Sequence, residues 1–311
     1  MPPRVSVVIP TYNAPVLLLE TLGTVLAQTF ADFEVVIIND GSTDDTAEQL
    51  KAVTDPRVRV ITQPNGGIGA ARNRGIDESR GEFIALLDHD DLWLPEKLQA
   101  QVDFLDAHPE CPSCTVRWAY SPAPDQMVYT PPADSLVHIK RPFAQLAAGW
   151  VFLISASIMA RKSALAGLRY FTRPKCIEDT PLQIRLLSRG PMGLAGDSIL
   201  MVYRWHANNY SSQADFFANG ILLLRELDAD NYFADCPKDE QADLDHFLAH
   251  LGRTATMRLI QAKRKKDVWR LYRREFRKQL SDGAVKYLLA TPLLVAAPQF
   301  LLSRAGVTPK G

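Results

Sequence analysis

The stretch Phe83-Ile84-Ala85-Leu86-Leu87-Asp88-His89-Asp90-Asp91 decides the fold. Its five apolar residues follow Gly81, are too few for a helix, and predict a strand buried on both faces. Carboxylates follow at once, at the end of the strand where open parallel sheets bind their ligands. Asp88 and Asp90 suit Mg²⁺, which usually takes one or two protein carboxylates and completes its shell with phosphate oxygens and water. An Asp-rich turn that ends the strand is the alternative interpretation.

Three further apolar runs precede this strand, and a helical pattern separates each run from the next. The runs are Arg4–Pro10, Phe33–Ile38 and Val58–Ile61. Such an alternation predicts βαβ units, a parallel sheet and right-handed crossovers. Ser42, with Asp45 three residues on, predicts a capping box for the second helix.

Each of these four strands ends in a polar or turn cluster. The clusters are Pro10–Asn13, Asn39–Ser42, Gln63–Gly67 and Asp88–Asp91. The carboxyl ends of parallel strands lie on one edge of a sheet, so we expect the clusters to converge on one crevice.

Beyond the fourth strand the pattern is less regular until the chain becomes helical near Asp215. We expect, in order, a helix Pro95–Ala107, short strands and loops over Cys111–Pro132, a short helix Pro142–Gly149, a strand Val151–Ala160, a helix opened by Glu178–Pro181, and a strand Ser198–Tyr203. Asp91 is expected to cap a helix ahead of Trp93-Leu94-Pro95.

Formal net charge is zero, but the charge is unevenly spread. The segment Arg253–Lys278 contains eleven Lys and Arg against Asp267 and Glu275. We expect one helix over Arg258–Leu280, basic and amphipathic, and an interfacial or partner-bound segment over Tyr287–Leu302, which is shorter than a membrane span. A C-terminal subdomain packed on the body is the alternative. A nucleic-acid role is not expected, since the aromatic side chains lie on one helical face.

The N-terminus runs into the first strand without a signal-peptide pattern, which predicts a cytoplasmic protein. The four cysteines fit that compartment. Cys111 and Cys114 have redox or half-zinc spacing, but no second pair completes a metal site. All four are therefore expected to be free thiols.

The segments in order resemble those of a family-two glycosyltransferase of the GT-A fold. They are Val7–Asn13, Ile37–Asp44, Asn65–Asn73, Leu87–Asp91, Glu178-Asp179 and Tyr203–His206. The resemblance spans Val5 to about Ser212. It implies an α/β chain with a GT-A-like, Rossmann-like mostly parallel sheet flanked by helices. We place the catalytic domain at 1–214 and a helical C-terminal region at 215–311.

The resemblance also implies a nucleotide-sugar donor, with UDP-sugar expected, and a divalent metal, Mg²⁺ or Mn²⁺. The residues implied for the donor are Pro10, Thr11, Tyr12, Asp40, Asn65, Arg72 and Asp88. Asp90 of the DxD motif and His206 are the implied metal ligands. A metal on the diphosphate oxygens offsets the charge that develops as the glycosidic bond breaks. A structural histidine and a solvated helix arginine are the alternatives for His206 and Arg72.

An inverting transfer needs a base to take the proton of the acceptor hydroxyl. The resemblance assigns this role to Asp179. Glu178, Trp150 and Arg204 are expected near the acceptor or behind the site, with Trp205 as a further stacking candidate. For Asp179 and Glu178 the alternative is helix capping, since Thr180-Pro181 is a good helix start. Asn39 stands where the family often has a second Asp, and His89 receives no role.

We therefore expect a metal-dependent glycosyltransferase acting on a glycan or lipid-linked acceptor in surface polysaccharide or glycolipid synthesis, peripheral at the inner face of the cell membrane. A non-catalytic nucleotide-sugar-binding or assembly protein on the same fold is the alternative. A nucleotidyltransferase fits less well, because Thr11-Tyr12-Asn13 does not supply its usual glycine- and lysine-rich phosphate loop.

Overall fold

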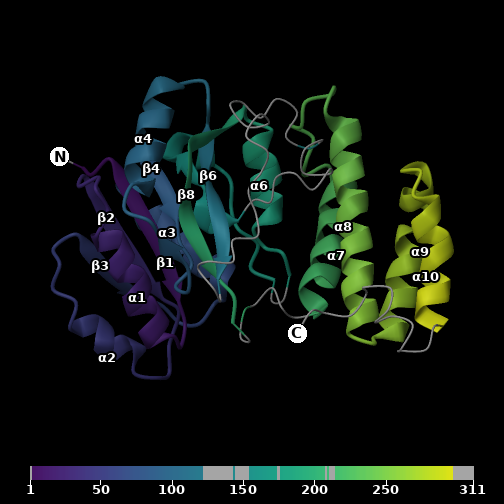
Figure 1. The fold of residues 1–311 in the computed structure, drawn as a ribbon, viewed down its shortest axis with the longest axis horizontal. Helices are drawn as coiled ribbons and strands as arrows, with labels where there is room; N and C mark the ends of the chain where they lie inside the picture. The colour runs from purple at the N-terminus through teal and green to yellow at the C-terminus, as the bar shows by residue number, and fades with distance from the viewer. Residues whose placement is uncertain are drawn as a thin grey trace. The chain divides into compact units, whose positions relative to one another are not determined.

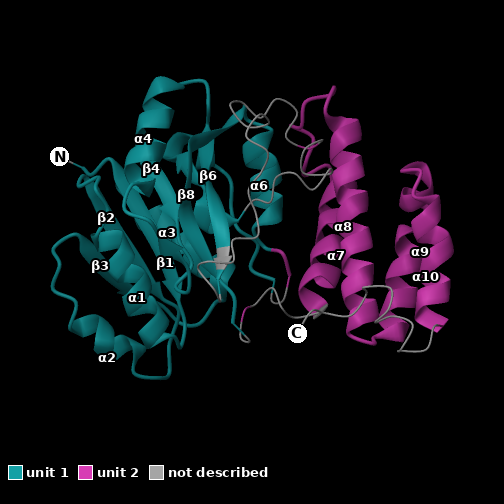
Figure 2. Cartoon of the chain, in the orientation of Figure 1, with its two compact units in different colours: residues 1–142, 150–174, 178–206 teal, residues 143–149, 175–177, 207–311 magenta. Residues whose placement is uncertain are grey.

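A computed structural model describes residues 2–121, 143, 154–173, 176–206, 209 and 214–296. The chain divides into two compact units (Figure 2). The first comprises 1–142, 150–174 and 178–206, and the second 143–149, 175–177 and 207–311.

The first unit contains a mixed sheet whose eight described strands follow the order β3-β2-β1-β4-β7-β6-β8-β5 (Figure 1). The strands are β1 (Val5–Thr11), β2 (Phe33–Asn39), β3 (Val58–Thr62), β4 (Phe83–Leu86), β5 (Leu92–Trp93), β6 (Ser113–Ser121), β7 (Met159–Arg161) and β8 (Met192–Arg204). The first four pair in parallel, as expected, and β7 joins β4 antiparallel.

Helices surround this sheet and make up the second unit. They are α1 (Pro15–Leu26), α2 (Thr46–Lys51), α3 (Ile68–Glu78), α4 (Lys97–Ala107), α6 (Thr180–Leu187), α7 (Ala214–Ala229), α8 (Gln241–Gln261), α9 (Lys265–Ser281) and α10 (Val285–Ala296), with short 3₁₀ turns η2 (Ser155–Ser157) and η3 (Lys162–Leu165).

Strand β1 shows why the first strands read as continuous apolar runs. Val5, Val7 and Ile9 belong to the main core, together with residues of α1 and α4. Val8 points to the other face, where a Cβ added at Gly75 of α3 would lie 2.2 Å from its Cγ1 atom. Helices therefore cover both faces of the strand, as parallel sheets require.

Two expected local features in the first unit are wrong. Ser42 does not cap α2; its hydroxyl oxygen accepts a hydrogen bond from the Asn13 N–H at 3.0 Å. Asp91 is not a helix cap either, since α4 begins only at Lys97 and Asp91 Oδ1 accepts a hydrogen bond from the Arg204 N–H at 3.1 Å. In both cases the polar group bonds to a segment distant in the sequence instead of to the helix.

After β4 the strands also have bounds that differ from those predicted from the sequence. The run expected to be irregular begins with a nine-residue strand, β6, which pairs with β8. Of the described part of the expected strand Val151–Ala160, only Met159 and Ala160 are confirmed, in β7; Ser155–Ser157 forms η2 instead. The predicted short helix Pro142–Gly149 lies outside the described residues apart from Phe143. All four cysteines are free, as predicted, and all four are buried.

The expected continuous helix Arg258–Leu280 is broken between α8 and α9. Lys263 has φ of 59°, and the Leu259 carbonyl accepts a hydrogen bond from the Arg264 N–H at 2.9 Å. This pattern is a Schellman cap, with lysine at the left-handed position usually taken by glycine. No described helix combines the length and hydropathy of a membrane-crossing segment.

Candidate active site

The predicted clusters follow the adjacent parallel strands β3, β2, β1 and β4. Thr11 and Asn39 are paired residues at the ends of β1 and β2. Asn13, with φ of 50°, ties the turn after β1 to the next loop, since its Oδ1 accepts a hydrogen bond from the Thr43 N–H at 2.8 Å. Among the nucleotide candidates here, Thr11 is buried with no polar partner for its hydroxyl among the described residues, whereas Tyr12 is exposed.

Asp40 holds the glycine loop that leads into α3. Its Oδ1 accepts hydrogen bonds from the Gly66 N–H at 2.9 Å and the Gln63 side-chain amide at 2.7 Å. Its Oδ2 accepts one from the Gly67 N–H at 2.8 Å, and Gly67 has φ of 85°. Both oxygens of this buried carboxylate therefore order the loop, which also contains Asn65.

Helix α3 docks the segment around Tyr170. The Asn73 side-chain amide makes two hydrogen bonds to the Tyr170 backbone. Its Nδ2 donates to the Tyr170 carbonyl at 2.9 Å, and its Oδ1 accepts from the Tyr170 N–H at 2.8 Å. A Cβ on Gly69 would lie 2.1 Å from the Phe171 carbonyl oxygen. The sequence Gly69–Asn73 thus serves close packing, and it aims Arg72 into the site.

Arg72 joins two carboxylates that are far apart in the sequence. Its guanidinium nitrogens lie 2.6 Å from Asp88 Oδ1 and 2.6 Å from Glu178 Oε1, and the group stacks over the Tyr170 ring at 5.1 Å. The side chain is 3% exposed, so it is not a solvated helix arginine. Burial lowers its pKa, but Asp88 and Glu178 outweigh burial and raise it well above its usual range.

The charge of this one guanidinium acts on three carboxyl groups: Asp88 and Glu178, which it contacts, and Asp179. Burial raises the pKa of Glu178 to about 7, against the opposing effect of Arg72. Burial also raises the pKa of Asp179, and Arg72 again opposes the shift while Asp88 adds to it. The arrangement favours retention of a proton within the group of carboxyls, since like charges cannot all ionise cheaply at close range.

Asp179 does not cap α6 through its side chain. Its Oδ2 accepts hydrogen bonds from the Ser155 hydroxyl at 3.2 Å and the Gln183 amide at 3.3 Å. The carboxylate is thereby oriented by η2 on one side and by the next turn of its own helix on the other.

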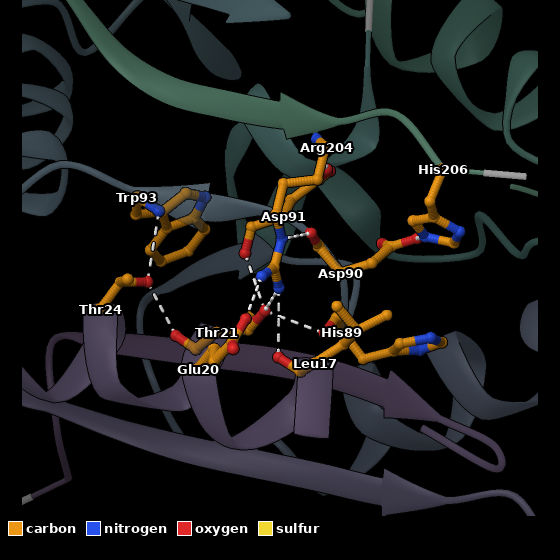
Figure 3. A network of polar contacts seen from close by, with 10 residues as sticks. All are labelled: Leu17, Glu20, Thr21, Thr24, His89, Asp90, Asp91, Trp93, Arg204 and His206. Atoms are coloured by element: carbon orange, nitrogen blue, oxygen red, sulfur yellow. Dashed lines mark hydrogen bonds and ion pairs between the residues drawn. The ribbon is translucent and has the colours of Figure 1, made fainter. Parts of the chain in front are cut away.

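Asp90 and His206 meet at the end of β8. Asp90 Oδ2 lies 3.0 Å from His206 Nε2, and both side chains are partly exposed (Figure 3). With Asp88 these residues offer carboxylate oxygens and an imidazole, donors that suit Mg²⁺ or Mn²⁺ when a phosphate completes the shell. The described residues contain no group of three or more protein metal ligands.

Arg204 lies behind this pair and connects it to α1 (Figure 3). Its guanidinium donates to the Asp90 carbonyl, to Glu20, to the Leu17 carbonyl and to the Thr21 hydroxyl. These contacts hold the Arg204 side chain between the backbone of Asp90 and helix α1.

Asp91 binds Arg204 through the backbone N–H of that residue. Burial, followed by the charges of Asp90 and Asp88, raises the pKa of Asp91 well above its usual range. His89, to which no role was assigned, has Nδ1 3.3 Å from the Pro10 carbonyl, and Trp205 is exposed. Trp150 lies outside the described residues.

The family model of glycosyl transferase family 2 matches residues 6–168. The chain belongs to glycosyltransferase family 2. The match includes Asp40, Arg72, Asp88 and Asp90 but ends before Asp179 and His206.

Curated relatives match a shorter segment. An uncharacterized glycosyltransferase of Rickettsia bellii is 43% identical over 104 residues, which are 33% of this chain and 15% of the relative. The uncharacterized glycosyltransferase EpsJ of Bacillus subtilis is 42% identical over 93 residues, 29% of this chain and 27% of the relative. The chain thus spans much less than two thirds of the length of these relatives.

Solved structures share the fold over most of the chain. S. aureus TarS 1–349 in complex with UDP-GlcNAc has a TM-score of 0.59 at 19% identity, covering 88% of this chain and 92% of that one. The mannosyltransferase PcManGT of Pyrobaculum calidifontis, in complex with GDP-Man and Mn²⁺, has a TM-score of 0.61 at 18% identity, covering 95% and 88%. The predicted GT-A class of fold is confirmed.

Sequence reasoning missed the residues that support the site. Ser155 and Gln183 orient Asp179, Tyr170 lies under Arg72, and Glu20 and Thr21 bind Arg204. None of these belongs to a recognisable motif in the sequence. Only the two hydrogen bonds between Asn73 and Tyr170 involve a residue that the sequence pointed to, since Asn73 belongs to the segment Asn65–Asn73.

Proposed function

We propose that this glycosyltransferase inverts the anomeric centre as it moves a sugar from a UDP-sugar to a hydroxyl of a glycan or lipid-linked acceptor. The observation that carries the proposal is the Asp179 carboxylate. Its side chain makes no capping hydrogen bond to α6 and is oriented by Ser155 and Gln183. The charge of Arg72, which is paired with Asp88 after β4, acts on this carboxylate electrostatically. A raised pKa makes such a carboxylate a stronger base once ionised.

In the proposed reaction the acceptor oxygen attacks the anomeric carbon while Asp179 takes the hydroxyl proton. The new glycosidic bond forms as the bond to the diphosphate breaks, and the bonding pair leaves with the diphosphate. Attack from the face opposite the leaving group converts an α-linked donor into a β-linked product. Arg72 is suited to hold Glu178, the neighbour of Asp179, in place beside Asp88.

A divalent cation would be held by Asp90 and His206, with Asp88 beside them, and would stabilise the negative charge of the departing diphosphate. The Asp90 carboxylate and the His206 imidazole fit this group, since they are oxygen and nitrogen donors whose side chains lie 3.0 Å apart. Arg204 acts here as a positioning residue, because it binds the backbone of Asp90 and is the last residue of β8, two residues before His206. The TarS complex with UDP-GlcNAc and the PcManGT complex with GDP-Man and Mn²⁺ support donor and metal classes of this kind.

The remaining nucleotide contacts are proposed on the same edge. Pro10, Thr11 and Tyr12 would flank the base, with Tyr12 exposed and free to stack. Asp40 would act through the loop of Asn65, since its oxygens already bind the Gly66 and Gly67 amides. We place the acceptor reaction at the inner membrane face, where glycolipid and polysaccharide precursors would be substrates.

The test is the variant Asp179→Asn, which keeps size and hydrogen bonding but removes the base. We expect a fall in kcat of about 10²–10⁴, with donor binding retained in a thermal-shift titration with UDP-sugars and Mn²⁺. Ser188→Ala, at the opposite end of α6, is the control for a disturbance of this helix and should keep most activity. Unchanged turnover in Asp179→Asn would refute the base assignment, and no turnover in the wild type with any acceptor would favour the binding-protein alternative.

A further inference from the structure

The second unit presents an apolar face that its own packing does not use. On α10, Val285, Leu289 and Leu293 are 53%, 67% and 71% exposed. They are four residues apart and therefore form one stripe along the helix. The opposite side of α10 is buried through Leu288, Thr291 and Val295. The helix thus has one face inside the unit and a second apolar face outside it.

Helix α9 places an exposed cationic surface beside α10. The two helices pack together, as the Tyr272 hydroxyl donates to the Leu288 carbonyl at 2.8 Å and its ring lies 6.2 Å from that of Tyr287. Arg273 and Arg277 are exposed, and neither has an acidic partner among the residues that the structure describes. Phe276 and Leu280 are exposed apolar side chains on this helix, at 40% and 55% exposure.

The inner side of α9 packs within the second unit and has its partners there. Glu275 is buried and accepts both hydrogen bonds of Arg225 from α7, at 3.1 and 2.9 Å. Val268 and Leu271 fill the same side. Glu275, one of the two acidic residues of α9, therefore pairs inside the unit. The outer surface of α9 is left strongly positive.

We infer that the outer faces of α9 and α10 bind the surface of an anionic phospholipid bilayer. Exposed apolar stripes of this kind mark interaction sites, and leucines flanked by Arg and Lys are typical of helices that lie in a membrane interface. A second copy of this face would meet it with like charge, and a nucleic acid would leave the leucines exposed. An anionic bilayer accepts both features at once: lipid headgroups pair with the cations and the acyl boundary takes the leucines.

This inference stands on unit-two residues alone and does not depend on the proposed catalytic role of Asp179. It concerns a helix pair lying on the surface, in agreement with the finding that no described helix could cross a membrane.

The experiment uses the full chain in flotation assays with vesicles of phosphatidylcholine, with or without phosphatidylglycerol. We expect binding to the anionic vesicles that weakens with salt. Leu289→Gln with Leu293→Gln should lower the apparent affinity by at least about tenfold, as should Arg273→Gln with Arg277→Gln. The matched control is Val16→Gln with Lys51→Gln, exposed residues of the first unit that should leave binding unchanged. Equal binding by all variants would overturn the inference.

A second measurement places the leucine face directly. Because the native cysteines are buried, a dye sensitive to polarity can be attached to Leu293→Cys, with Val16→Cys as control. A blue-shifted emission on anionic vesicles at position 293 but not at 16 is the expected result. No shift at 293 would contradict insertion.

Two further outcomes would also overturn the inference. Loss of binding only in the arginine variant, with RNA competing fully, would indicate a polyanion site. Conversion of a dimer into a monomer by the leucine substitutions, seen by light scattering, would make the face a contact between copies. Unchanged melting temperature and UDP-sugar stabilisation would show that the variants are folded.

Discussion

Arg72 and Glu178 form a buried ion pair, with Nη1 and Oε1 2.6 Å apart. They are 106 residues apart in the sequence. The pair attaches α3 to the residues immediately before α6, and Asp88 completes it on the other side of the guanidinium. A break in this pair affects both the stability of the first unit and the position of Asp179.

We expect Arg72→Met to destabilise the protein by about 3–5 kcal/mol, because it leaves buried carboxylates without their cation. Glu178→Gln should cost less, since the amide oxygen still accepts from Arg72, the guanidinium keeps Asp88, and no carboxylate is left without its cation. Urea unfolding monitored by circular dichroism measures both. Arg74→Met, an exposed neighbour on α3, is the control. Equal losses for Arg72→Met and Arg74→Met would show that the pair contributes little.

Lys97 predicts a pH dependence of stability. It is fully buried, its Nζ lies 2.5 Å from Gln101 Oε1 and 3.8 Å from the Trp93 ring centre, and burial lowers its pKa to about 7. The unfolded lysine keeps its usual pKa near 10.5, so between these values the unfolded state binds more protons. Folding stability should therefore rise with pH across that window and fall as pH drops toward 7.

The variant Lys97→Met isolates this effect. The difference in unfolding free energy between wild type and variant should change by up to about 1.4 kcal/mol per pH unit between pH 7 and 9. Lys51→Met, whose lysine is exposed, should show no such slope. If the difference in unfolding free energy between wild type and Lys97→Met does not change with pH, Lys97 is not neutral in the folded state.

Arg204→Ala should weaken binding of Mn²⁺ in the presence of a nucleoside diphosphate by about 10–100-fold, as loss of a residue supporting metal ligands commonly does. The free metal signal in electron paramagnetic resonance measures this directly. Arg204→Lys should recover part of the loss, since it keeps a donor toward Asp90. A fall in turnover with unchanged Mn²⁺ affinity would instead assign Arg204 a role away from the metal.

Gly69→Ala should destabilise the protein and weaken donor stabilisation, because the new Cβ would lie 2.1 Å from the rigid Phe171 carbonyl oxygen. Gly23→Ala, inside α1 with nothing within 4 Å of the added atom, should be neutral or stabilising by up to about 1 kcal/mol. Thermal melting of the two variants, with and without UDP-sugar and Mn²⁺, compares them. Similar melting temperatures would contradict the close approach of α3 to Phe171.

The sequence predicts most of the first unit, because its strands and helices follow local patterns of burial and period. Apolar runs bounded by glycine and polar clusters identified β1 to β4, and their order required a parallel arrangement. That arrangement alone brought Asp40 and Asp88 to one edge. Where a local signal competed with a distant partner it failed: Ser42 and Asp91 resembled caps but bind Asn13 and Arg204.

Only the tertiary structure decided how the candidate residues connect. The pairing of Arg72 with Glu178, the orientation of Asp179 by Ser155 and the anchoring of Arg204 on α1 join segments that no periodicity relates. The sequence likewise did not predict the helix end at Lys263, because the left-handed position is occupied by lysine and not by glycine, the residue that usually marks such an end. Sequence patterns record which side chains seek burial, whereas contacts between distant polar groups depend on the packing geometry that burial produces.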